Sequence, residues 1–449
     1  MAAGQGKRMV SRLPKVLHPL AGRPLLSHVL TTARSIAPQT VAVVVGHGAT
    51  AVQEAFSQEA DLVFVEQHPP RGTGDAVRVA LTALSDADIT LVMNGDCPLI
   101  AASSVRRLCD AAARGALVWL TVKTPSPQGL GRIVRDARGQ VQAIVEERDA
   151  DDAQKKIDEI NVGVLAAPTA LLKRWVGQLT CDNAQQEYYL TDVLAMAVRE
   201  GVPVETVQAD DERDTRGVND RVQLAEVERI VQRRQAEALM RQGVTLADPA
   251  RFDLRGTLHC GRDVSIDVGC VFEGEVTLGD DVVIGAHCVL RNVALAEGVK
   301  VAPFSHLDGA NVGAQAVIGP YARLRPGAKL AERVHVGNFV EIKASTLGAG
   351  SKANHLSYLG DAEIGANVNI GAGTITCNYD GVNKYKTTIG DDAFIGSNTA
   401  LVAPITVGQG ATIGAGSTLS EDAEAQALTF TRTRPIIKKD WPRPAKKKE

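Results

Sequence analysis

The sequence is poor in aromatic residues, which make up only 4% of its 449 residues. This scarcity argues against a sandwich core built on Trp and Tyr and favours a core of Ile, Val and Leu. The net charge is also small, −3, which gives no indication of a nucleic-acid-binding protein. No apolar run approaches the length of a membrane span, and no signal peptide is recognisable. We therefore expect neither a nucleic-acid partner nor a membrane.

The seven cysteines are an odd number and include no C-x-x-C pair. This pattern argues against a disulfide framework and a structural zinc site, and it is typical of a reducing compartment. We expect a cytoplasmic protein. The Lys446-Lys447-Lys448 run near the end of the chain is interpreted as a solvated tail.

A long internal repeat is present, in which an aliphatic or aromatic residue recurs every six positions from about Val264 to Leu419. A period of six fits neither a helical turn of 3.6 residues nor a simple alternation. The series slips by one residue in a few places and is interrupted between Thr376 and Thr388. Its members are Ile266, Phe272, Leu278, Ile284, Leu290, Leu295, Val301, Leu307, Val312, Ile318, Leu324, Leu330, Val336, Ile342, Leu347, Ala353, Leu359, Ile364, Ile370, Ile389, Ile395, Leu401, Val407, Ile413 and Leu419.

We interpret this repeat as a parallel β-helix with three sides. Each hexapeptide makes one short strand, a small residue such as Gly279 or Gly285 turns the corner, and about eighteen residues complete a coil. The side chains of the repeat then stack inward, with coils separated by the usual strand spacing of ~4.8 Å. The alternative, a sandwich with scattered glycine turns, is disfavoured by a pattern sustained over so many positions.

The N-terminal part shows an α/β pattern around a glycine-rich loop, Ala2-Ala3-Gly4-Gln5-Gly6, which basic residues follow. Such a loop can wrap its backbone N–H groups around phosphates while Arg8 and Lys15 neutralise their charge. By itself the G-x-G motif is weak evidence for a phosphate-binding site. It is more often only a turn, and it matches neither the dinucleotide motif nor a Walker loop.

Three segments of this part are predicted to be buried strands, at residues 41–46, 62–65 and 90–93. The third ends in Asn94-Gly95-Asp96. An acid at the carboxyl end of a strand, facing a glycine-rich loop, is the usual position for holding Mg²⁺ beside phosphates. The alternative for Asp96 is a turn or cap residue. Farther on, the cap pair Asn219-Asp220, helical apolar spacing and the stop at Gly243 predict one long helix.

These motifs together resemble those of the sugar-1-phosphate nucleotidyltransferases. The resemblance rests on A-A-G-x-G-x-R-M, L-P-K, the segment from Gln67 to Gly74, and N-G-D. With the hexapeptide array behind them, the whole chain is similar to the bifunctional bacterial enzymes that acetylate glucosamine 1-phosphate and then uridylylate the product to UDP-N-acetylglucosamine, which feeds peptidoglycan and lipopolysaccharide synthesis. The resemblance implies a Rossmann-like nucleotidyltransferase domain at 1–218, a linker helix at 219–244, a left-handed parallel β-helix at 245–425 and a tail at 426–449.

The resemblance also implies the residues of a uridylyl-transfer site. Lys15 would lie on the phosphates of UTP, and Asp96 and Asn219 would share the Mg²⁺. In phosphoryl transfer the protein mainly positions the reactants and neutralises charge, and a lysine together with the Mg²⁺ ligands aspartate and asparagine can do both. Without the resemblance, Glu146 and Asn161 would be better interpreted as surface polar residues. The other residues expected to bind UTP or the amino sugar are Ala2, Ala3, Gly4, Gln67, Gly72, Thr73, Asn94, Gly95, Gly131, Glu146 and Asn161.

For the β-helix the resemblance implies an acetyl-transfer site in which His355 is the general base and Glu341 assists it. An amine that attacks the thioester of acetyl-CoA must lose a proton, and an imidazole suits this task. Without the resemblance, a lone histidine on a solenoid is ordinarily structural. Glucosamine 1-phosphate is expected to contact Arg325, Lys343, Tyr358 and Asn369, and acetyl-CoA is expected to contact Ala372, Asn378, Tyr379, Ser397, Ala415 and Arg432.

Three alternatives were weighed. A zinc site between subunits is disfavoured because His287, His306, His335 and His355 fall on different coils with no close pair. A single-activity nucleotidyltransferase with a regulatory or oligomerising β-helix is disfavoured, because such a β-helix would not need the cluster of Arg325, Lys343, His355 and Tyr358. A non-catalytic scaffold is disfavoured by Lys15 and Asp96. Flat prism faces with projecting loops favour a homotrimer with acetyl-transfer sites at its interfaces.

The chain departs from the family pattern in two places. The family has a hydrophobic strand before the A-A-G loop, where this sequence has only Met1. A sheet without that central strand would leave buried edges unpaired, so we expect the natural protein to carry several more N-terminal residues. Position 7, where Thr is frequent in the family, is Lys7, which adds a cation near the phosphates.

Overall fold

The computed structural model describes residues 1–84, 88–183, 185–432 and 435–443. The Lys446-Lys447-Lys448 run lies outside these described residues. The chain forms two compact units, Met1–Val231 and Gln232–Glu449. The boundary falls inside helix α7 (Arg221–Arg241), within the segment 219–244 that the sequence assigned to a linker helix.

The first unit is an α/β structure whose sheet is in two parts. The larger part has the order β10-β6-β9-β7-β8, with β5 also paired to β9, and the smaller part is the parallel pair β3-β4. The predicted strands at 41–46, 62–65 and 90–93 are confirmed to within a residue or two. The bounds are β3 (Val41–Val45), β4 (Leu62–Glu66), β5 (Ile89–Val92), β6 (Leu117–Lys123), β7 (Arg132–Arg135), β8 (Val141–Val145), β9 (Glu159–Pro168) and β10 (Val204–Gln208), and a separate antiparallel pair joins β1 (Pro19–Leu20) and β2 (Arg23–Pro24).

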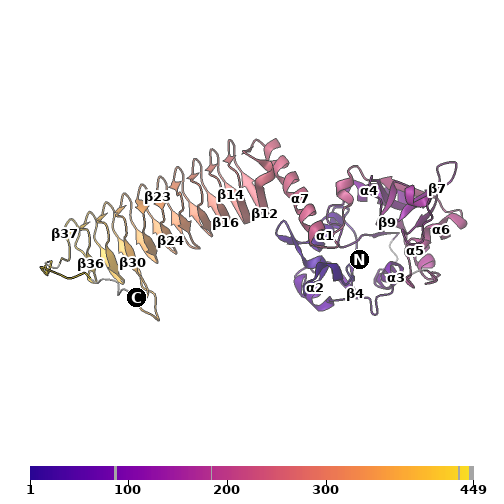
Figure 1. Cartoon of the computed structure of the whole chain (residues 1–449), viewed down its shortest axis with the longest axis horizontal. Coiled ribbons are helices and arrows are strands. Elements are labelled where there is room, and N and C mark those ends of the chain that lie inside the picture. Colours follow the sequence, from indigo (N-terminus) through magenta and orange to yellow (C-terminus); the bar gives the residue numbers. More distant parts are fainter. Residues whose placement is uncertain (85–87, 184, 433–434, 444–449) are drawn as a thin grey trace. The chain divides into compact units, whose positions relative to one another are not determined.

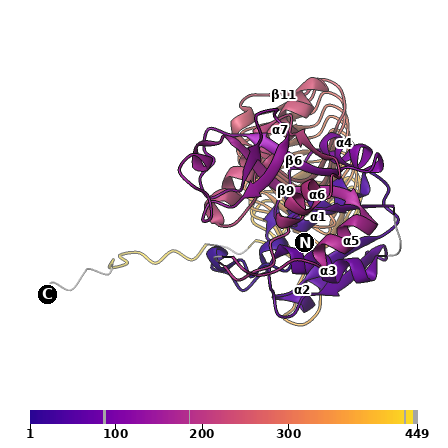
Figure 2. The same cartoon turned by 90° about the vertical axis from the view of Figure 1, so that its right-hand side faces the viewer.

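Helices cover this sheet. Strand β6 is buried along almost its whole length, as a continuous apolar run requires when both sheet faces are covered. Helix α4 packs on β6 and β9, and α3 lies beside α5 (Figure 1, Figure 2). The bounds are α1 (Leu25–Arg34), α2 (Ala49–Ala55), α3 (Thr73–Ala83), α4 (Ala102–Ala113), α5 (Thr169–Val176) and α6 (Asp192–Arg199), with short 3₁₀ turns at η1 (Lys7–Met9), η2 (Lys15–Leu17), η3 (Gln154–Lys156) and η4 (Glu212–Thr215).

Helix α7 confirms the predicted long helix after Asn219-Asp220. The side chain of Asp220 accepts a hydrogen bond of 2.9 Å from the backbone N–H of Gln223, which satisfies one of the free donors at the helix start. Gly243 follows the helix with a φ of 99°, a left-handed conformation that glycine adopts without steric cost. Among the described residues, no helix has the length and apolarity needed to cross a bilayer.

The second unit is a parallel β-helix, whose coils stack in one row from β12 to β37 (Figure 1). One face is the 11-stranded sheet, and the 16-stranded sheet branches at β16 into the other two faces. The first face holds β11 (Thr245–Leu246), β13 (Ser265–Ile266), β15 (Val283–Ile284), β17 (Lys300–Val301), β20 (Val317–Ile318), β23 (His335–Asn338), β26 (Lys352–His355), β29 (Asn369–Ile370), β32 (Phe394–Ile395), β35 (Thr412–Ile413) and β37 (Leu428–Thr429).

The other two faces share the long first strands of the prism. After the turn η5 (Pro249–Arg251), these are β12 (Phe252–Cys260), β14 (Cys270–Leu278) and β16 (Val289–Leu295). One branch continues through β19 (Asn311–Val312), β22 (Lys329–Leu330), β25 (Thr346–Leu347), β28 (Ala362–Ile364), β31 (Thr387–Ile389) and β34 (Ile405–Val407). The other holds β18 (His306–Asp308), β21 (Arg323–Leu324), β24 (Glu341–Lys343), β27 (Tyr358–Gly360), β30 (Ile375–Cys377), β33 (Ala400–Val402) and β36 (Thr418–Leu419).

The core of the prism confirms the six-residue series. Every member of the series is at most 5% exposed, and all belong to one continuous hydrophobic cluster. The predicted coil of eighteen residues holds for some coils only. Ser265 pairs with Val283 one coil later, eighteen positions on, whereas Val283 pairs with Lys300, seventeen positions on. Each one-residue slip in the series therefore shortens one coil by one residue without moving the inward side chains.

Candidate active sites

The first site lies where the carboxyl ends of β3, β4 and β5 meet the N-terminal loop. The ammonium of Lys15 forms an ion pair with the carboxylate of Asp96 and donates a hydrogen bond of 3.2 Å to the amide oxygen of Asn219. The side chains of Lys15 and Asp96 are only 12% and 23% exposed. The backbone carbonyl of Asp96 accepts a hydrogen bond of 2.9 Å from the N–H of Val218, which keeps Asp96 next to the segment that carries Asn219. The structure thus joins three predicted residues that are up to 204 positions apart.

These groups fit a magnesium ion. The oxygens of Asp96 and Asn219 converge on one cationic nitrogen, that of Lys15, so they define a position where a cation is stabilised. One carboxylate and one neutral oxygen are typical of Mg²⁺ sites in which water and substrate phosphates supply the other ligands. Among the described residues, no group of three or more His, Cys, Asp or Glu could hold a metal by itself.

Backbone hydrogen bonds attach two of the predicted nucleotide-binding residues, Ala2 and Gln67, to the end of β3. The backbone N–H of Ala2 donates to the carbonyl of Val44 at 2.7 Å, and the N–H of Gln67 donates to that of Val45 at 2.8 Å. These bonds bring the start of the chain and Gln67 to neighbouring strand ends. Ala2 and Ala3 are buried, while Gly4, Lys7 and Arg8 are exposed and face solvent.

Gln67 connects the strand end to the start of helix α3. Its buried amide donates to the carbonyl of Gly72 at 3.0 Å and to the carboxylate of Asp75 at 2.9 Å. Gly72 has a φ of 106°, and a side chain there would meet the backbone of Tyr188 at 2.7 Å. The hydroxyl of Thr73 accepts the N–H of Leu190 at 3.2 Å. Gln67 on one side, and Tyr188 and Leu190 on the other, therefore hold the predicted segment Gly72-Thr73 in place.

The predicted amino-sugar residues form a second group on β7, β8 and β9. The N–H of Asn161 donates to the carbonyl of Gly131 at 2.8 Å, and the side chain of Asn161 accepts the N–H of Gly163 at 2.8 Å. A Cβ on Gly131 would lie 3.3 Å from a carboxylate oxygen of Glu146, and one on Gly163 would meet the amide of Asn94. Gly131, Glu146, Asn161 and Asn94 are thus neighbours.

The carboxylate of Glu146 is partly removed from water. Burial raises the pKa of Glu146, and the negative charges of Asp149 and Asp192 raise it further. Tyr189, whose hydroxyl is buried without a protein partner, lies close enough for Glu146 to raise its pKa as well. Asp149, Tyr189 and Asp192 could not be recognised in the sequence, because no short motif connects them to Glu146.

The second site occupies neighbouring coils of the β-helix. Arg325 donates to Glu341 at 2.8 Å, and Lys343 donates to Asp361 at 3.4 Å. Strands β24 and β27 pair so that Glu341 stands opposite Tyr358 and Lys343 opposite Gly360. Arg325, Lys343 and Tyr358 therefore share one face of the prism. Each of the two basic side chains is paired with a carboxylate, and a substrate phosphate could take the place of that carboxylate.

His355 ends β26, at the corner of the prism next to this face. Its Nδ1 lies 3.0 Å from the amide oxygen of Asn338, which stands opposite it in β23. Because an amide oxygen only accepts, this contact places a hydrogen on Nδ1, and in the neutral imidazole Nε2 is then the nitrogen with the lone pair. The ring is exposed, so Nε2 can reach a substrate. Asn338, which holds this ring nitrogen, was not singled out from the sequence. Glu341 pairs with Arg325, so its expected assistance to His355 stays a prediction.

Three predicted acetyl-CoA residues continue the corner that holds His355. The carbonyl of His355 accepts the N–H of Gly373 at 3.4 Å, that of Ala372 accepts the N–H of Asn398 at 2.7 Å, and that of Ser397 accepts the N–H of Gly416 at 2.8 Å. Ala372, Ser397 and Ala415 therefore follow one another on successive coils. All three side chains are small, and they stand on the same corner of the prism as His355.

The break in the repeat forms a hairpin between β30 and β31 that leaves the wall of the prism (Figure 1). Asn378 is 7% exposed and donates to Asp361, whereas Tyr379 is 60% exposed. Tyr379 pairs with Lys384 across the hairpin. The neighbouring Lys343 side chain lowers the pKa of Lys384. Asp361 and Lys384 belong to this cluster, although no sequence motif indicated them.

Two predicted residues lie apart from this cluster. Asn369 is in β29, on the 11-stranded face, whereas Tyr358 and Lys343 are on a different face. Arg432 lies beyond the last strand, and its guanidinium sits 5.4 Å from the centre of the Phe430 ring.

Models of known families match both halves of the chain. A MobA-like NTP transferase domain matches residues 1–160, a GMPPB C-terminal domain matches 254–347, and six bacterial transferase hexapeptide repeats match 386–421. A solved nucleotidyl transferase from Methanothermobacter thermautotroptrophicus is 21% identical, covers 54% of this chain and 96% of its own, and superposes with a TM-score of 0.36.

Curated relatives match along the whole chain. The Bifunctional protein GlmU of Bordetella parapertussis is 59% identical over 451 residues, covering 100% of this chain and 98% of its own. The protein of the same name from Burkholderia vietnamiensis is 58% identical over 448 residues, covering 100% and 99%. The chain belongs to the GlmU family.

As a member of the GlmU family, the chain is a bifunctional enzyme, with a uridylyltransferase half and an acetyltransferase half, that acts in UDP-N-acetylglucosamine synthesis for the cell wall. The hexapeptide half is the left-handed parallel β-helix that the resemblance implied. The alternative of a single-activity nucleotidyltransferase is set aside, since these GlmU relatives are bifunctional over their full length.

Proposed function

We propose that the first unit transfers the uridylyl group of UTP to N-acetylglucosamine 1-phosphate and releases pyrophosphate. The observation that carries this assignment is the convergence of Asp96 and Asn219 on the ammonium of Lys15. In the proposed complex Asp96 and Asn219 hold a Mg²⁺ ion, which supplies charge neutralisation at the phosphates. Lys15 turns to the phosphates as a second positive charge.

The neutral amide of Asn161 and the carboxylate of Glu146 then orient the sugar through its hydroxyl and amide groups. The hydrogen bonds that fix Asn161 to Gly131 and Gly163 keep this recognition surface rigid. The sugar phosphate oxygen attacks the α-phosphorus in line, the P–O bond to the β-phosphate breaks, and pyrophosphate leaves.

For the second unit we propose acetyl transfer from acetyl-CoA to glucosamine 1-phosphate, with His355 as general base. The amine nitrogen attacks the thioester carbonyl, the C–N bond forms, the C–S bond breaks, and Nε2 of His355 takes the proton. Arg325, Lys343 and Tyr358 bind the sugar phosphate. Acetyl-CoA lies along the corner where Ala372, Ser397 and Ala415 follow one another, with its thioester at His355.

We further propose that the protein works as a homotrimer with acetyl-transfer sites shared between subunits. Within one chain Asn369 lies on a different face from Lys343 and Tyr358. A neighbouring prism packed against the corner at His355 would bring its own Asn369 or hairpin to the site. The exposed Tyr379 on that hairpin supports a contact outside its own prism. The seven free thiols support a reducing compartment, the cytoplasm.

Chelation of divalent cations tests whether uridylyl transfer requires a metal ion and acetyl transfer does not. With EDTA in excess, we expect release of pyrophosphate from UTP to stop while release of free CoA thiol from acetyl-CoA continues at its full rate, because only the first site uses a metal. Restoring Mg²⁺ should restore pyrophosphate release. Uridylyl transfer that persists without divalent cations would contradict the proposed metal site.

Mixing two variants tests the shared acetyl-transfer site. We expect His355→Ala and Asn378→Ala to be inactive alone, and to regain part of the acetyl-transfer activity after subunit exchange, because some mixed interfaces combine intact residues from both. Mass spectrometry of differently tagged chains verifies the exchange. If verified mixed oligomers stay inactive, each site is built from a single chain.

A further inference from the structure

The amide side chain of Gln67 is held in one orientation by two groups that only accept hydrogen bonds. Gln67 directly follows β4 and is 3% exposed. Its Nε2 donates to the carbonyl of Gly72 at 3.0 Å and to the carboxylate of Asp75 at 2.9 Å. A primary amide carries two N–H donors on its nitrogen and accepts only through its oxygen. Both N–H groups are therefore used, and Oε1 is left for another partner.

The opposite orientation of this amide is disfavoured. A rotation by half a turn would bring Oε1 against the Gly72 carbonyl and the Asp75 carboxylate, so that two hydrogen bonds would be lost and acceptors would face acceptors. Water has little access to replace these bonds, because the side chains of Gln67 and Asp75 are both buried. The orientation of the Gln67 amide thus depends on the carboxylate of Asp75 as well as on the backbone of Gly72.

Asp75 is itself fixed in the first turn of helix α3. Its other carboxylate oxygen forms an ion pair with the guanidinium of Arg78, three residues later on the same helix. Arg78 in turn lies 5.2 Å from the centre of the Tyr188 ring, within the range of a cation–π contact. A negative charge in the first turn also interacts favourably with the helix dipole. As the partner of a guanidinium, Asp75 is a carboxylate that only accepts hydrogen bonds.

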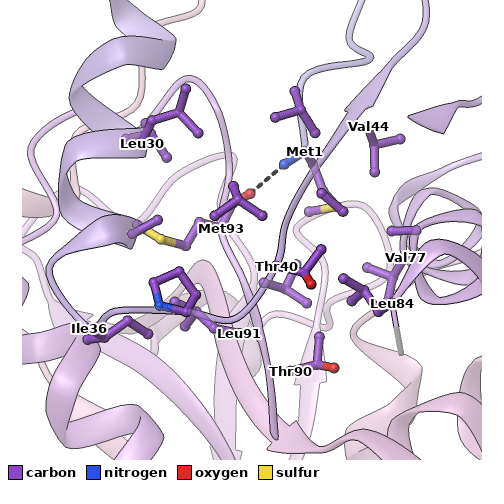
Figure 3. Close-up of a pocket in the computed structure, with 18 of the residues that line it drawn as sticks. Met1, Leu30, Ile36, Thr40, Val44, Val77, Leu84, Thr90, Leu91 and Met93 are labelled. Carbon is purple, nitrogen blue, oxygen red and sulfur yellow. Dashed lines mark hydrogen bonds between the residues drawn. The ribbon is translucent and has the colours of Figure 1, made fainter. Parts of the chain in front are cut away.

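Apolar contacts fix the helix that carries Asp75. Val77 of α3 is 2% exposed and belongs to a hydrophobic core cluster of the first unit. Figure 3 shows Val77 and Leu84, which follows the helix, on the same side of an apolar pocket as Val44 of β3. The start of α3 is therefore a rigid support for the Gln67 amide.

The remaining oxygen of Gln67 is an unpaired acceptor beside the glycine-rich loop. Among the described residues Oε1 has no hydrogen-bond partner, and it is not sealed from solvent. The backbone of Gln67 is bonded to Val45 at the end of β3. The next residue, Gly46, touches the loop, since a Cβ there would lie 3.0 Å from the carbonyl oxygen of Ala3.

An acceptor of this kind distinguishes uracil from cytosine. Uracil carries a hydrogen on N3, whereas cytosine has a lone pair on the same ring atom. With Oε1 of Gln67 opposite N3, uracil donates a hydrogen bond, while cytosine places one lone pair against another. Sites built to bind an N–H or O–H group reject analogues that lack it by factors of up to about 10⁴–10⁵.

We propose that Asp75 is a positioning residue that determines the nucleotide specificity of the first unit. Its carboxylate sets the orientation of the Gln67 amide, so that Oε1 accepts the N3 hydrogen of uracil and UTP is selected over CTP. Arg78 supports this role by holding the other oxygen of Asp75. The inference rests on the proposed uridylyl transfer, because it concerns the nucleotide of that reaction.

Three nucleotides test the free acceptor on the unaltered chain. Pyrophosphate release with N-acetylglucosamine 1-phosphate and Mg²⁺ is measured for UTP, for CTP and for 3-methyluridine 5′-triphosphate, in which a methyl group replaces the N3 hydrogen. We expect kcat/KM to be lower by about 10²-fold or more for CTP and for the methylated nucleotide than for UTP. Equal use of UTP and CTP would overturn this inference and leave uridylyl transfer in place. No release from UTP would contradict the proposed function, and this inference with it.

Asp75→Asn tests the role of the carboxylate. Because asparagine can donate a hydrogen bond to Oε1, the rotated Gln67 amide becomes possible and can donate to N3 of cytosine. We expect the ratio of kcat/KM for UTP to that for CTP to fall by about 10-fold, which corresponds to one hydrogen bond. Asp75→Glu keeps a group that only accepts and should preserve most of the ratio. The matched control is Asp110→Asn, the same change at an exposed position of α4, which should leave the ratio unchanged.

The nucleotide ratio separates this role from a purely structural one. If Asp75 only stabilises the start of α3, Asp75→Asn should lower the thermal stability and the rates with both nucleotides together. The ratio would then keep its original value, and the proposal would be overturned. If Asp75→Asn does not fold, Asp75→Ser takes its place, since a hydroxyl also donates, and the same fall in the ratio is expected.

Discussion

Replacement of His355 by alanine is expected to lower acetyl transfer by about 10²–10⁴-fold, the range that a general base contributes. The amine of the substrate is largely protonated near neutral pH, so the reactive neutral form has to be generated at the thioester. Nδ1 of His355 is held by Asn338 at 3.0 Å, which leaves Nε2 as the only ring nitrogen free to accept that proton. The Michaelis constant for glucosamine 1-phosphate should change little, because in the proposed complex its phosphate contacts Arg325 and Lys343.

The matched control for this variant is His335→Ala. His335 is also exposed and begins β23, the strand that carries Asn338, but it lies at the far end from the corner. We expect this control to acetylate normally. Uridylyl transfer should be unchanged in both variants. If His355 only packs between coils, its loss should instead lower the thermal stability and weaken both activities together. A stable His355→Ala protein that acetylates at the normal rate would exclude His355 as the base.

Replacement of Asp96 by alanine is expected to lower uridylyl transfer on the order of 10³-fold or more, because metal-assisted charge stabilisation is worth several kcal/mol in such reactions. The variant removes the one carboxylate that converges with Asn219 on the cation position. It also leaves Lys15 without its ion pair, so added Mg²⁺ should not restore the rate. Acetyl transfer should keep its full rate.

Asp110→Ala serves as the control for Asp96→Ala, since Asp110 is an exposed carboxylate on α4 of the same unit. Both proteins are compared over a Mg²⁺ titration of pyrophosphate release. A normal Mg²⁺ dependence in Asp96→Ala would remove this residue from the metal site.

Much of the β-helix could be predicted because its signal is local. Each inward residue is set by its own hexapeptide, so the series from Ile266 to Leu419 identified the core without knowledge of the coil length. Contacts across coils depend on that length. His355 meets Asn338 because the coil between them has seventeen residues rather than eighteen. Asn338 was therefore not recognisable as the partner of His355 in the sequence.

The same distinction applies to the candidate sites. Lys15 and Asp96 stand in short motifs, and the sequence predicted both. Lys384 joins the second cluster only because the hairpin after β30 folds back to Lys343, whereas Asp361 joins it because the next coil places this residue beside Lys343. A one-dimensional pattern holds no information about where an irregular hairpin returns. The pairing of Asn219 with Lys15, which are 204 residues apart, came from the resemblance and not from periodicity.

The most direct test of two independent sites is the formation of UDP-N-acetylglucosamine from glucosamine 1-phosphate, acetyl-CoA and UTP by His355→Ala and Asp96→Ala, separately and mixed. We predict that His355→Ala alone forms almost no product, that Asp96→Ala alone accumulates N-acetylglucosamine 1-phosphate, and that the mixture forms the nucleotide sugar. Accumulation of the intermediate by His355→Ala, or a mixture that stays inactive although each variant retains its other half-reaction, would contradict the account.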